Sequence, residues 1–346
     1  MNHAAALTML ISCALLLGCH TTIADRAHPV PESDLWLTYK GGDGPGVGKH
    51  IVLIAAEQEY RAEQAMPMLA RTLSQHHGFD CTVLFLMNED GLVDPTQPSP
   101  FKEEGRDNIV PGLQHLAEAD AVIWFSRFLQ LNDEDIQHLY DYFDSGKPMV
   151  VLRTANHGLW RDNKPYVVNG ERVSLREMLG GAFMGHYGGW KREATLGITV
   201  PENADHPVLI GVDRVWGTTN AYKCHKDDQV PADCTPLLMG QPMRSHDPAA
   251  EANTDKAPVP VAWTKTWTGN QGKASPILHF TMGSAQDFAN EGVRRVTVNG
   301  VYWGLGMADQ IKPDSDMSII GEYKPMKDGF NYEKLGVKPR PASYFR

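Results

Sequence analysis

Titratable side chains stand where short apolar runs of the sequence end, which is where buried strands deliver side chains to a site. In GKPMVVLRTANHGLW, residues 146–160, the apolar run 149–152 leads directly into Arg153 and His157. Such a continuous, partly β-branched run is typical of a strand that is buried on both faces in a parallel sheet. Because ligands of open α/β sheets bind outside the carboxyl ends of the strands, these side chains are candidates for a binding site.

Two further apolar runs end in charged residues. Residues 51–56 lead into Glu57 and Glu59, and residues 121–125 lead into Arg127. The two glutamates alternate along an extended segment, so only one of them is expected to face the site. Glu59 is the preferred catalytic carboxylate.

Arg127 and Arg153 each have two interpretations. A guanidinium at a strand end either binds the oxygens of a ligand or is the buried partner of a carboxylate such as Glu59. Two arginines at one edge of a sheet favour an oxygen-rich ligand, and a small-molecule carbohydrate such as a sugar or sugar acid fits that description.

His157 and His186 are the candidates for acid–base catalysis or metal binding, because imidazole titrates near pH ~6.5 and can give or take a proton. The alternative for each is a structural histidine. Tyr187 and Trp190 either stack on a sugar ring or pack in the fold. The sequence identifies no metal, and a divalent ion remains an open alternative. The predicted catalytic residues are His186, His157 and Glu59, and the predicted substrate-binding residues are Arg153, Arg127, Tyr187, Trp190 and Gln286.

The elements that must position these residues follow a strand–helix–strand rhythm, which indicates right-handed crossovers and a parallel sheet. An apolar stripe at Met66, Leu69, Ala70 and Leu73 predicts a helix, with Pro67 in its first turn. Strands are predicted at 51–56, 82–86, 121–125 and 149–152, shorter strands at 197–200, 259–263 and 276–280, a helix capped by Asn132, and a last helix over about 291–305 capped by Asp287.

The composition favours one elaborated α/β domain. The chain has 346 residues and a formal net charge of −10, without a run of basic residues. That charge argues against nucleic acid or an anionic membrane surface as a partner. The sequence does not give the oligomeric state. The expected boundaries are a signal peptide at 1–19, a tether and a loop that enters the domain at 20–47, the domain at 48–310, and an extended C-terminal tail at 311–346.

The N-terminus predicts export. Its short apolar core is typical of a signal peptide and ends in LLGC, residues 16–19, which resembles a bacterial lipobox. We expect a periplasmic or cell-envelope lipoprotein that touches the membrane only through a lipid anchor at Cys19. In an oxidising compartment Cys224 and Cys234 either pair or remain thiols.

Several short segments carry a resemblance when they are read together. They are Met149–Ala155, Leu179–His186, His206–Pro207, Pro260–Thr264, Thr281–Ser284 and Tyr302–Gly306. In these segments the chain resembles the ThuA-like (trehalose utilisation) family of the class I glutamine amidotransferase-like superfamily. The resemblance implies a flavodoxin-like, glutamine amidotransferase-like α/β fold: a central, mostly parallel sheet flanked by helices, here with an irregular glycine-rich insertion and an extended C-terminal tail.

The chain departs from the family at two positions. The residue after the strand 149–152 is a nucleophilic cysteine in the amidotransferases and a histidine in many ThuA-like proteins, whereas here it is Arg153. An arginine stays charged and can neither attack nor shuttle a proton near neutral pH. Gly283 is followed by Ser284, where the family often has histidine. The chain is therefore not expected to be a glutamine amidotransferase.

Three hypotheses follow. The first is an exported ThuA-like protein of carbohydrate utilisation that hydrolyses or isomerises a sugar or keto-sugar without a cysteine nucleophile. The second is a non-catalytic carbohydrate-binding lipoprotein, which Arg153 favours. The third is a metal-dependent hydrolase.

Overall fold

A ten-stranded mixed sheet carries the candidate site. The computed structural model describes residues 27–100, 102–103 and 105–346, so the expected signal peptide at 1–19, with Cys19, lies outside the described residues. In spatial order the strands are β1 (Trp36–Tyr39), β3 (Asp80–Phe85), β2 (His50–Ala56), β4 (Ala121–Ser126), β5 (Met149–Leu152), β14 (Ala274–Phe280), β13 (Val259–Thr268), β12 (Cys234–Met243), β9 (Ala194–Thr199) and β10 (Val215–Gly217).

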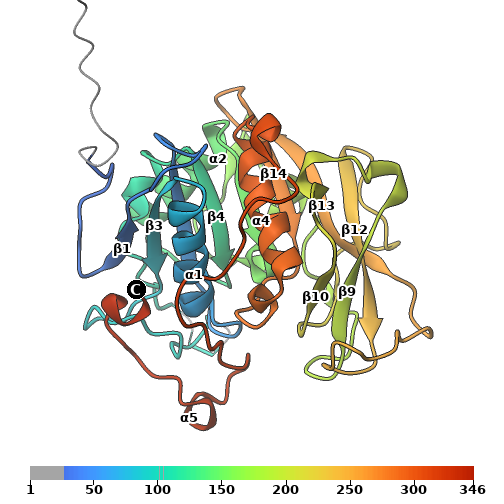
Figure 1. Cartoon of the computed structure of the whole chain (residues 1–346). Coiled ribbons are helices and arrows are strands. Elements are labelled where there is room, and N and C mark those ends of the chain that lie inside the picture. The colour runs from blue at the N-terminus through green and yellow to red at the C-terminus, as the bar shows by residue number, and fades with distance from the viewer. Residues whose placement is uncertain (1–26, 101, 104) are drawn as a thin grey trace, which may run out of the picture.

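The centre of this sheet is parallel, as the sequence predicted. Strands β3, β2, β4, β5 and β14 run in the same direction, and numbered along the chain they have the flavodoxin-like order 2-1-3-4-5. The antiparallel strands β13, β12, β9 and β10 extend the sheet on the β14 side (Figure 1). On the other side β1 pairs antiparallel with β3, inside the segment that was expected to be a loop.

The parallel strands are buried on both faces because their side chains alternate between two cores. In β2, Ile51, Leu53 and Ala55 join one apolar cluster, while Val52 and Ile54 join the other. Figure 1 shows α1 (Ala62–Gln75) and α4 (Glu291–Gly304) together on one face, with α2 (Asp133–Asp144) behind the sheet. The continuous apolar runs of the sequence are therefore explained by burial on both sides.

The helix ends agree with the sequence in part. Asn132 caps α2 by accepting hydrogen bonds from two backbone N–H groups of its first turn, as predicted. Two predictions were wrong. Pro67 is the sixth residue of α1, because that helix begins earlier than its apolar stripe, and Asn290 caps α4 in place of Asp287, whose carboxylate bonds to Thr219 and to backbone N–H groups of the preceding loop.

Shorter elements surround the carboxyl ends of the parallel strands. A 3-10 helix, Arg153–His157, follows β5 directly. Strand β8 (Gly185–His186) pairs with β11 (Tyr222–Lys223), and β6 (Val167–Val168) pairs with β7 (Glu171–Arg172). The remaining helices are α3 (Leu175–Leu179) and α5 (Tyr332–Leu335).

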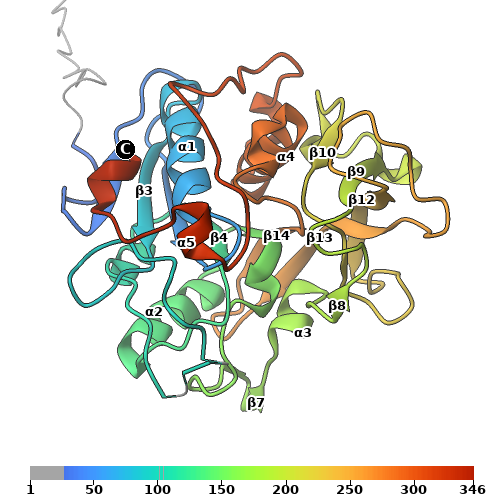
Figure 2. The same ribbon diagram turned by 90° about the horizontal axis from the view of Figure 1, so that it is seen from below.

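The C-terminal segment crosses the strand ends. In Figure 2 this red segment, which carries α5, passes over the ends of the central strands. Residues 323–332, here called the strap, are attached to the loop after β2: Gly329 donates its N–H to the Glu59 carbonyl at 2.8 Å, and the Tyr332 hydroxyl donates to the Gln58 carbonyl at 3.2 Å. Among the residues that the structure describes, no helix is long and apolar enough to cross a membrane.

Candidate functional site

The candidate site lies where the order of the parallel strands reverses, between β2 and β4. A crevice forms outside the carboxyl ends of the strands at such a switch point, because the crossovers on its two sides leave in opposite directions. Glu59 follows β2, Arg127 follows β4, and Arg153 follows β5, so one edge of the sheet presents all three residues.

Arg153 is a fully buried cation that holds protein groups together. Its Nη1 donates to the carbonyl oxygens of Asn220 and Thr281, at 2.8 and 2.9 Å, and its Nη2 donates to the Tyr60 hydroxyl at 3.2 Å. The guanidinium carbon lies 4.5 and 3.8 Å from the ring centroids of Tyr60 and Tyr222, so the charge is stabilised between two aromatic rings. Because Arg153 is fully buried and both of its terminal nitrogens donate to protein groups, the structure favours a positioning role for it over direct contact with a substrate, although its Nε has no partner among the described residues. It positions other groups.

One of these groups is Asn220, which in turn orients His186. The Asn220 Oδ1 accepts from Arg153 Nη2 at 3.3 Å, so its Nδ2 faces the other way and donates to the Gly188 carbonyl and to His186 Nδ1, both at 3.0 Å. Since His186 Nδ1 accepts this hydrogen bond, the partners assign the proton of the neutral imidazole to Nε2. Burial and the charge of Arg153 lower the pKa of His186. At neutral pH the exposed His186 therefore presents an N–H donor.

His157 has the opposite polarity. Its Nδ1 lies 2.7 Å from Asn156 Oδ1, an acceptor, which assigns the proton to Nδ1 and leaves a lone pair on Nε2. Among the described residues, Nε2 has no hydrogen-bond partner. Burial, followed by the charges of Arg127 and Arg153, lowers the pKa of His157 well below its ordinary value. His157 is thus a neutral base at pH 7.

Two aromatic residues bring the histidines together. The ring centroid of Phe183 lies 4.7 Å from that of His157 and 5.3 Å from that of His186. The corresponding distances from Tyr222 are 6.0 and 5.6 Å. The register of β8 with β11 sets this geometry, because it pairs His186 with Tyr222.

Glu59 completes the group. Its Oε1 accepts from Trp190 Nε1 at 2.9 Å, and its Oε2 lies 4.0 Å from Arg127 Nε. The Trp190 ring centroid lies 5.9 Å from that of His186, which connects this carboxyl group to the histidines. Burial raises the pKa of Glu59, and the charge of Arg127 opposes this shift in part.

Glu57 has a different function from Glu59. Its carboxylate accepts hydrogen bonds from the backbone N–H groups of Glu59, Tyr60 and Ala62, at 2.5 to 3.0 Å. It therefore holds the loop after β2 in place. Glu59, whose carboxylate contacts Trp190 and Arg127, stays the predicted site carboxylate.

The structure does not bring all the predicted residues to the site. Tyr187 is partly buried and packs against the core on the α1 and α4 side, which favours the packing alternative over stacking on a sugar ring. Within the described ranges, the Gln286 side chain makes no hydrogen bond to a site residue, and Gln286 precedes a short 3-10 helix. The sequence reasoning missed Asn220, Tyr60, Tyr222, Phe183 and the strap residue Asp328, whose pKa burial raises while Arg153 opposes the shift.

Among the described residues, neither the cysteines nor the residue types that bind metals form a separate site. Cys81, Cys224 and Cys234 are buried and unpaired. Burial raises the pKa of Cys224 to about 12 and that of Cys234 to about 11, so both stay protonated near neutral pH. Within the described part of the chain, no group of three or more His, Cys, Asp or Glu residues is placed to hold a metal ion.

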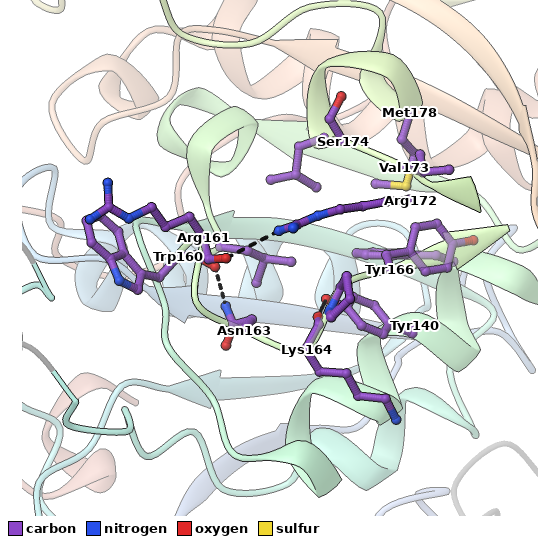
Figure 3. A pocket seen from close by; sticks show the side chains of 14 residues that line it. Tyr140, Trp160, Arg161, Asn163, Lys164, Tyr166, Arg172, Val173, Ser174 and Met178 are labelled. Carbon is purple, nitrogen blue, oxygen red and sulfur yellow. Dashed lines mark hydrogen bonds between the residues drawn. The ribbon is translucent and has the colours of Figure 1, made fainter. Parts of the chain in front are cut away.

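A separate cavity of about 160 Å³ lies on the α2 side of the sheet. Figure 3 shows Arg172 extended toward the backbone oxygen of Arg161, with Tyr140 and Tyr166 on one side. The Asn163 side-chain amide donates hydrogen bonds to the carbonyl oxygens of Trp160 and Leu129. None of the predicted site residues lines this cavity.

The chain matches a family model and resembles solved structures. A family model described as ThuA, trehalose utilisation, matches residues 101–304. A ThuA-like protein from Bacteroides uniformis has a similar structure at 16% identity and a TM-score of 0.46, covering 80% of this chain and 98% of that chain. A second, from Parabacteroides merdae, has 12% identity and a TM-score of 0.42, covering 86% and 98%. No curated protein matches the sequence.

Proposed function

Because the chain belongs to the ThuA family, which is described by trehalose utilisation, we propose that it processes a sugar or keto-sugar by proton transfer without a cysteine nucleophile. The observation that carries this proposal is the pair of histidines with opposite polarity. His157 offers a lone pair on Nε2, and His186 offers an N–H on Nε2, beside the same two aromatic rings.

Such a pair suits the removal of a proton next to a carbonyl group. His157 Nε2 takes the proton from the carbon, and the electron pair moves onto the carbonyl oxygen. His186 Nε2–H donates a hydrogen bond to this oxygen as its negative charge develops. In an isomerisation the proton returns from His157 to the former carbonyl carbon, while the hydroxyl group on the deprotonated carbon passes its proton to the former carbonyl oxygen and becomes the new carbonyl group. In a hydrolysis the electron pair instead expels the glycosidic oxygen from the carbon on the other side of the deprotonated carbon, and His157 gives its proton to this leaving oxygen. Water then adds across the carbon–carbon double bond that remains.

Glu59 and Arg127 suit the binding of the sugar hydroxyl groups. The raised pKa of Glu59 lets it keep its proton to higher pH than an exposed glutamate, so it both donates and accepts hydrogen bonds. Trp190, which is 41% exposed and bonded to Glu59, offers an aromatic face for the apolar side of a sugar ring.

The test is turnover of glucosides and 3-keto-glucosides, followed by NMR in D₂O so that exchange of a carbon-bound proton is detected. We expect His157→Gln to lower kcat by about 10²- to 10⁴-fold while the affinity for the sugar is retained. Because the pKa of His157 is lowered, the midpoint of the decrease in rate on the acid side of the pH–rate profile should lie below pH ~6.5. His76→Gln, at the end of α1 and away from the site, is the matched control.

A non-catalytic carbohydrate-binding protein is the second candidate. It is favoured by Arg153, a buried positioning residue where the amidotransferases carry their nucleophile. Sugar binding without any turnover or proton exchange, and with the same affinity in His157→Gln, would establish this candidate and exclude the enzyme.

We also propose that the protein is exported and anchored by a lipid at Cys19, for which LLGC at 16–19 is the support. Cys19→Ser is expected to move the protein out of the membrane fraction of an expressing bacterium. An unchanged distribution would contradict the anchor.

A further inference from the structure

A cavity of about 230 Å³ lies beside the candidate site, and its walls are the loop after β2, residues 96–99 with Lys102, and the strap. Gln58, Arg127, Phe330 and Tyr332 contribute to its lining. Arg127 belongs to both places, since its Nε lies 4.0 Å from Glu59 Oε2. The cavity therefore adjoins the site at Arg127, which follows β4.

Gln58 is the unusual residue of this cavity. Its side chain is 1% exposed, yet among the described residues neither Nε2 nor Oε1 has a hydrogen-bond partner. A buried amide without partners destabilises a fold, so such a group needs a reason to be there. The backbone of Gln58 is held in place, because its backbone carbonyl oxygen accepts hydrogen bonds from the side chains of Arg61 and Tyr332. Gln58 thus lines the cavity with a side-chain amide whose donor and acceptor groups are both unused.

The opposite wall is aromatic and belongs to the strap. The Arg127 guanidinium carbon lies 5.0 Å from the Phe330 ring centroid, and that of Arg61 lies 5.6 Å from the Tyr332 ring centroid. These contacts hold both rings in place. The strap lies outside residues 101–304, the range that the family model matches.

We propose that this cavity is a subsite for a second sugar unit of the substrate. An amide matches a sugar hydroxyl, which also donates and accepts, and the rings of Phe330 and Tyr332 match the apolar face of a pyranose. Arg127 adds donors for hydroxyl oxygens. The inference rests on the proposed function, and it makes the preferred substrate a disaccharide or a glycoside with a sugar-like second group.

The experiment compares calorimetric affinities for trehalose and glucose, and for their 3-keto forms, in the wild type and in Gln58→Met. Methionine keeps the length of the side chain and removes both polar groups. We expect the wild type to bind the disaccharide about tenfold more tightly than the monosaccharide, and Gln58→Met to lose this preference with unchanged monosaccharide affinity. The melting temperature of Gln58→Met should be equal to or above that of the wild type.

Gln241→Met is the matched control. Gln241 is also buried, but its Nε2 donates to three backbone carbonyl groups, those of Pro242, Asn253 and Lys256. This variant should have a lower melting temperature and an unchanged preference for the disaccharide. If Gln58→Met behaved in the same way, Gln58 would be structural and the subsite would be overturned.

The remaining outcomes separate the two proposals. A wild type that binds both kinds of sugar equally well, or a Gln58→Met variant that keeps the preference, overturns the subsite and leaves the proposed function standing. A wild type that neither binds nor converts any of these sugars overturns the proposed function and the subsite with it.

Discussion

Arg153 has an unusual conformation for its type, with a φ of 43° in the left-handed region. A side chain with a Cβ atom pays roughly 1–2 kcal/mol there, so surrounding contacts must hold it. Its bonds to Asn220 and Thr281, and its place between Tyr60 and Tyr222, provide them. Through Asn220 the same residue orients His186.

The positioning role of Arg153 predicts a change that a purely structural residue would not cause. Arg153→Met should destabilise the fold by about 2–4 kcal/mol, because two buried carbonyl groups lose their donors. It should also raise the pKa of His186, since the charge of Arg153 lowers it. Urea denaturation and NMR titration of the histidine measure the two effects.

Arg172→Met, an exposed arginine on β7, is the control for this variant and should change neither quantity. If the pKa of His186 stayed where it is in the wild type, the assigned effect of the Arg153 charge on His186 would be wrong.

The junction of β2 with α1 is the element on which the site depends. The Glu57 carboxylate binds the first backbone N–H groups of this turn, and Arg61 precedes the helix with a left-handed φ of 62°. Glu63, in the first turn of α1, is buried 3.7 Å from Arg61. The buried side chains of Arg61 and Glu63 therefore hold the loop that carries Gln58 and Glu59.

Glu63 makes the stability of this junction depend on pH. Burial raises the pKa of Glu63 to about 7, and Arg61 opposes the shift only in part. The folded state therefore prefers the protonated acid, and stability falls as pH rises from the unfolded pKa, near 4.5, through about 7. Glu63→Gln, which resembles the neutral acid, should gain on the order of 3 kcal/mol relative to the wild type between pH ~4.5 and ~8.

Urea denaturation at several pH values measures this gain. Glu134→Gln, in the exposed first turn of α2, is the control and should show no comparable dependence. A Glu63→Gln effect of the same size at every pH would contradict the assigned pKa.

At the scale of the whole molecule, acid sensitivity comes from three buried histidines far from one another in the sequence. Burial lowers the pKa of His50 and of His77 to about 4 and that of His279 to about 3. The folded state keeps all three neutral, whereas the unfolded chain takes up protons near pH ~6.5. Stability is therefore lost as pH falls below that value.

The expected loss follows from these shifts. Between pH ~7.5 and ~5.5 the histidines remove about 4 kcal/mol, and Glu63, which acts in the opposite sense, returns about 2 kcal/mol. These four groups together should therefore account for a loss of about 2 kcal/mol in urea denaturation, and the lowered pKa of His157 adds to the loss in the same direction. His279→Phe, beside Trp263, should lose about 1 kcal/mol less, and an equal loss in both proteins would refute the assignment.

The sequence by itself determined the parallel half of the sheet and its helices. Burial on both faces leaves a local signal in β2, β4 and β5, namely a continuous apolar run, and the charged residues after each run follow from it. Glu59 and His157 were predicted in this way, whereas His186 and Trp190 were predicted from the glycine-rich segment at 180–190. The antiparallel strand β12 was not, because its apolar residues are interrupted by proline and glycine at 236, 240 and 242.

Only the tertiary structure decided how the site is connected. One partner of Arg153 is Asn220, 67 residues away. The backbone carbonyl of Gln58 accepts a hydrogen bond from Tyr332, 274 residues away. The hydrophobic periodicity of a short segment cannot predict such pairs, because neither residue of a pair changes the hydrophobic pattern around the other. The role of Arg153, the polarity of each histidine and the unpaired amide of Gln58 are properties of contacts between distant segments, and these contacts exist only once the chain is folded.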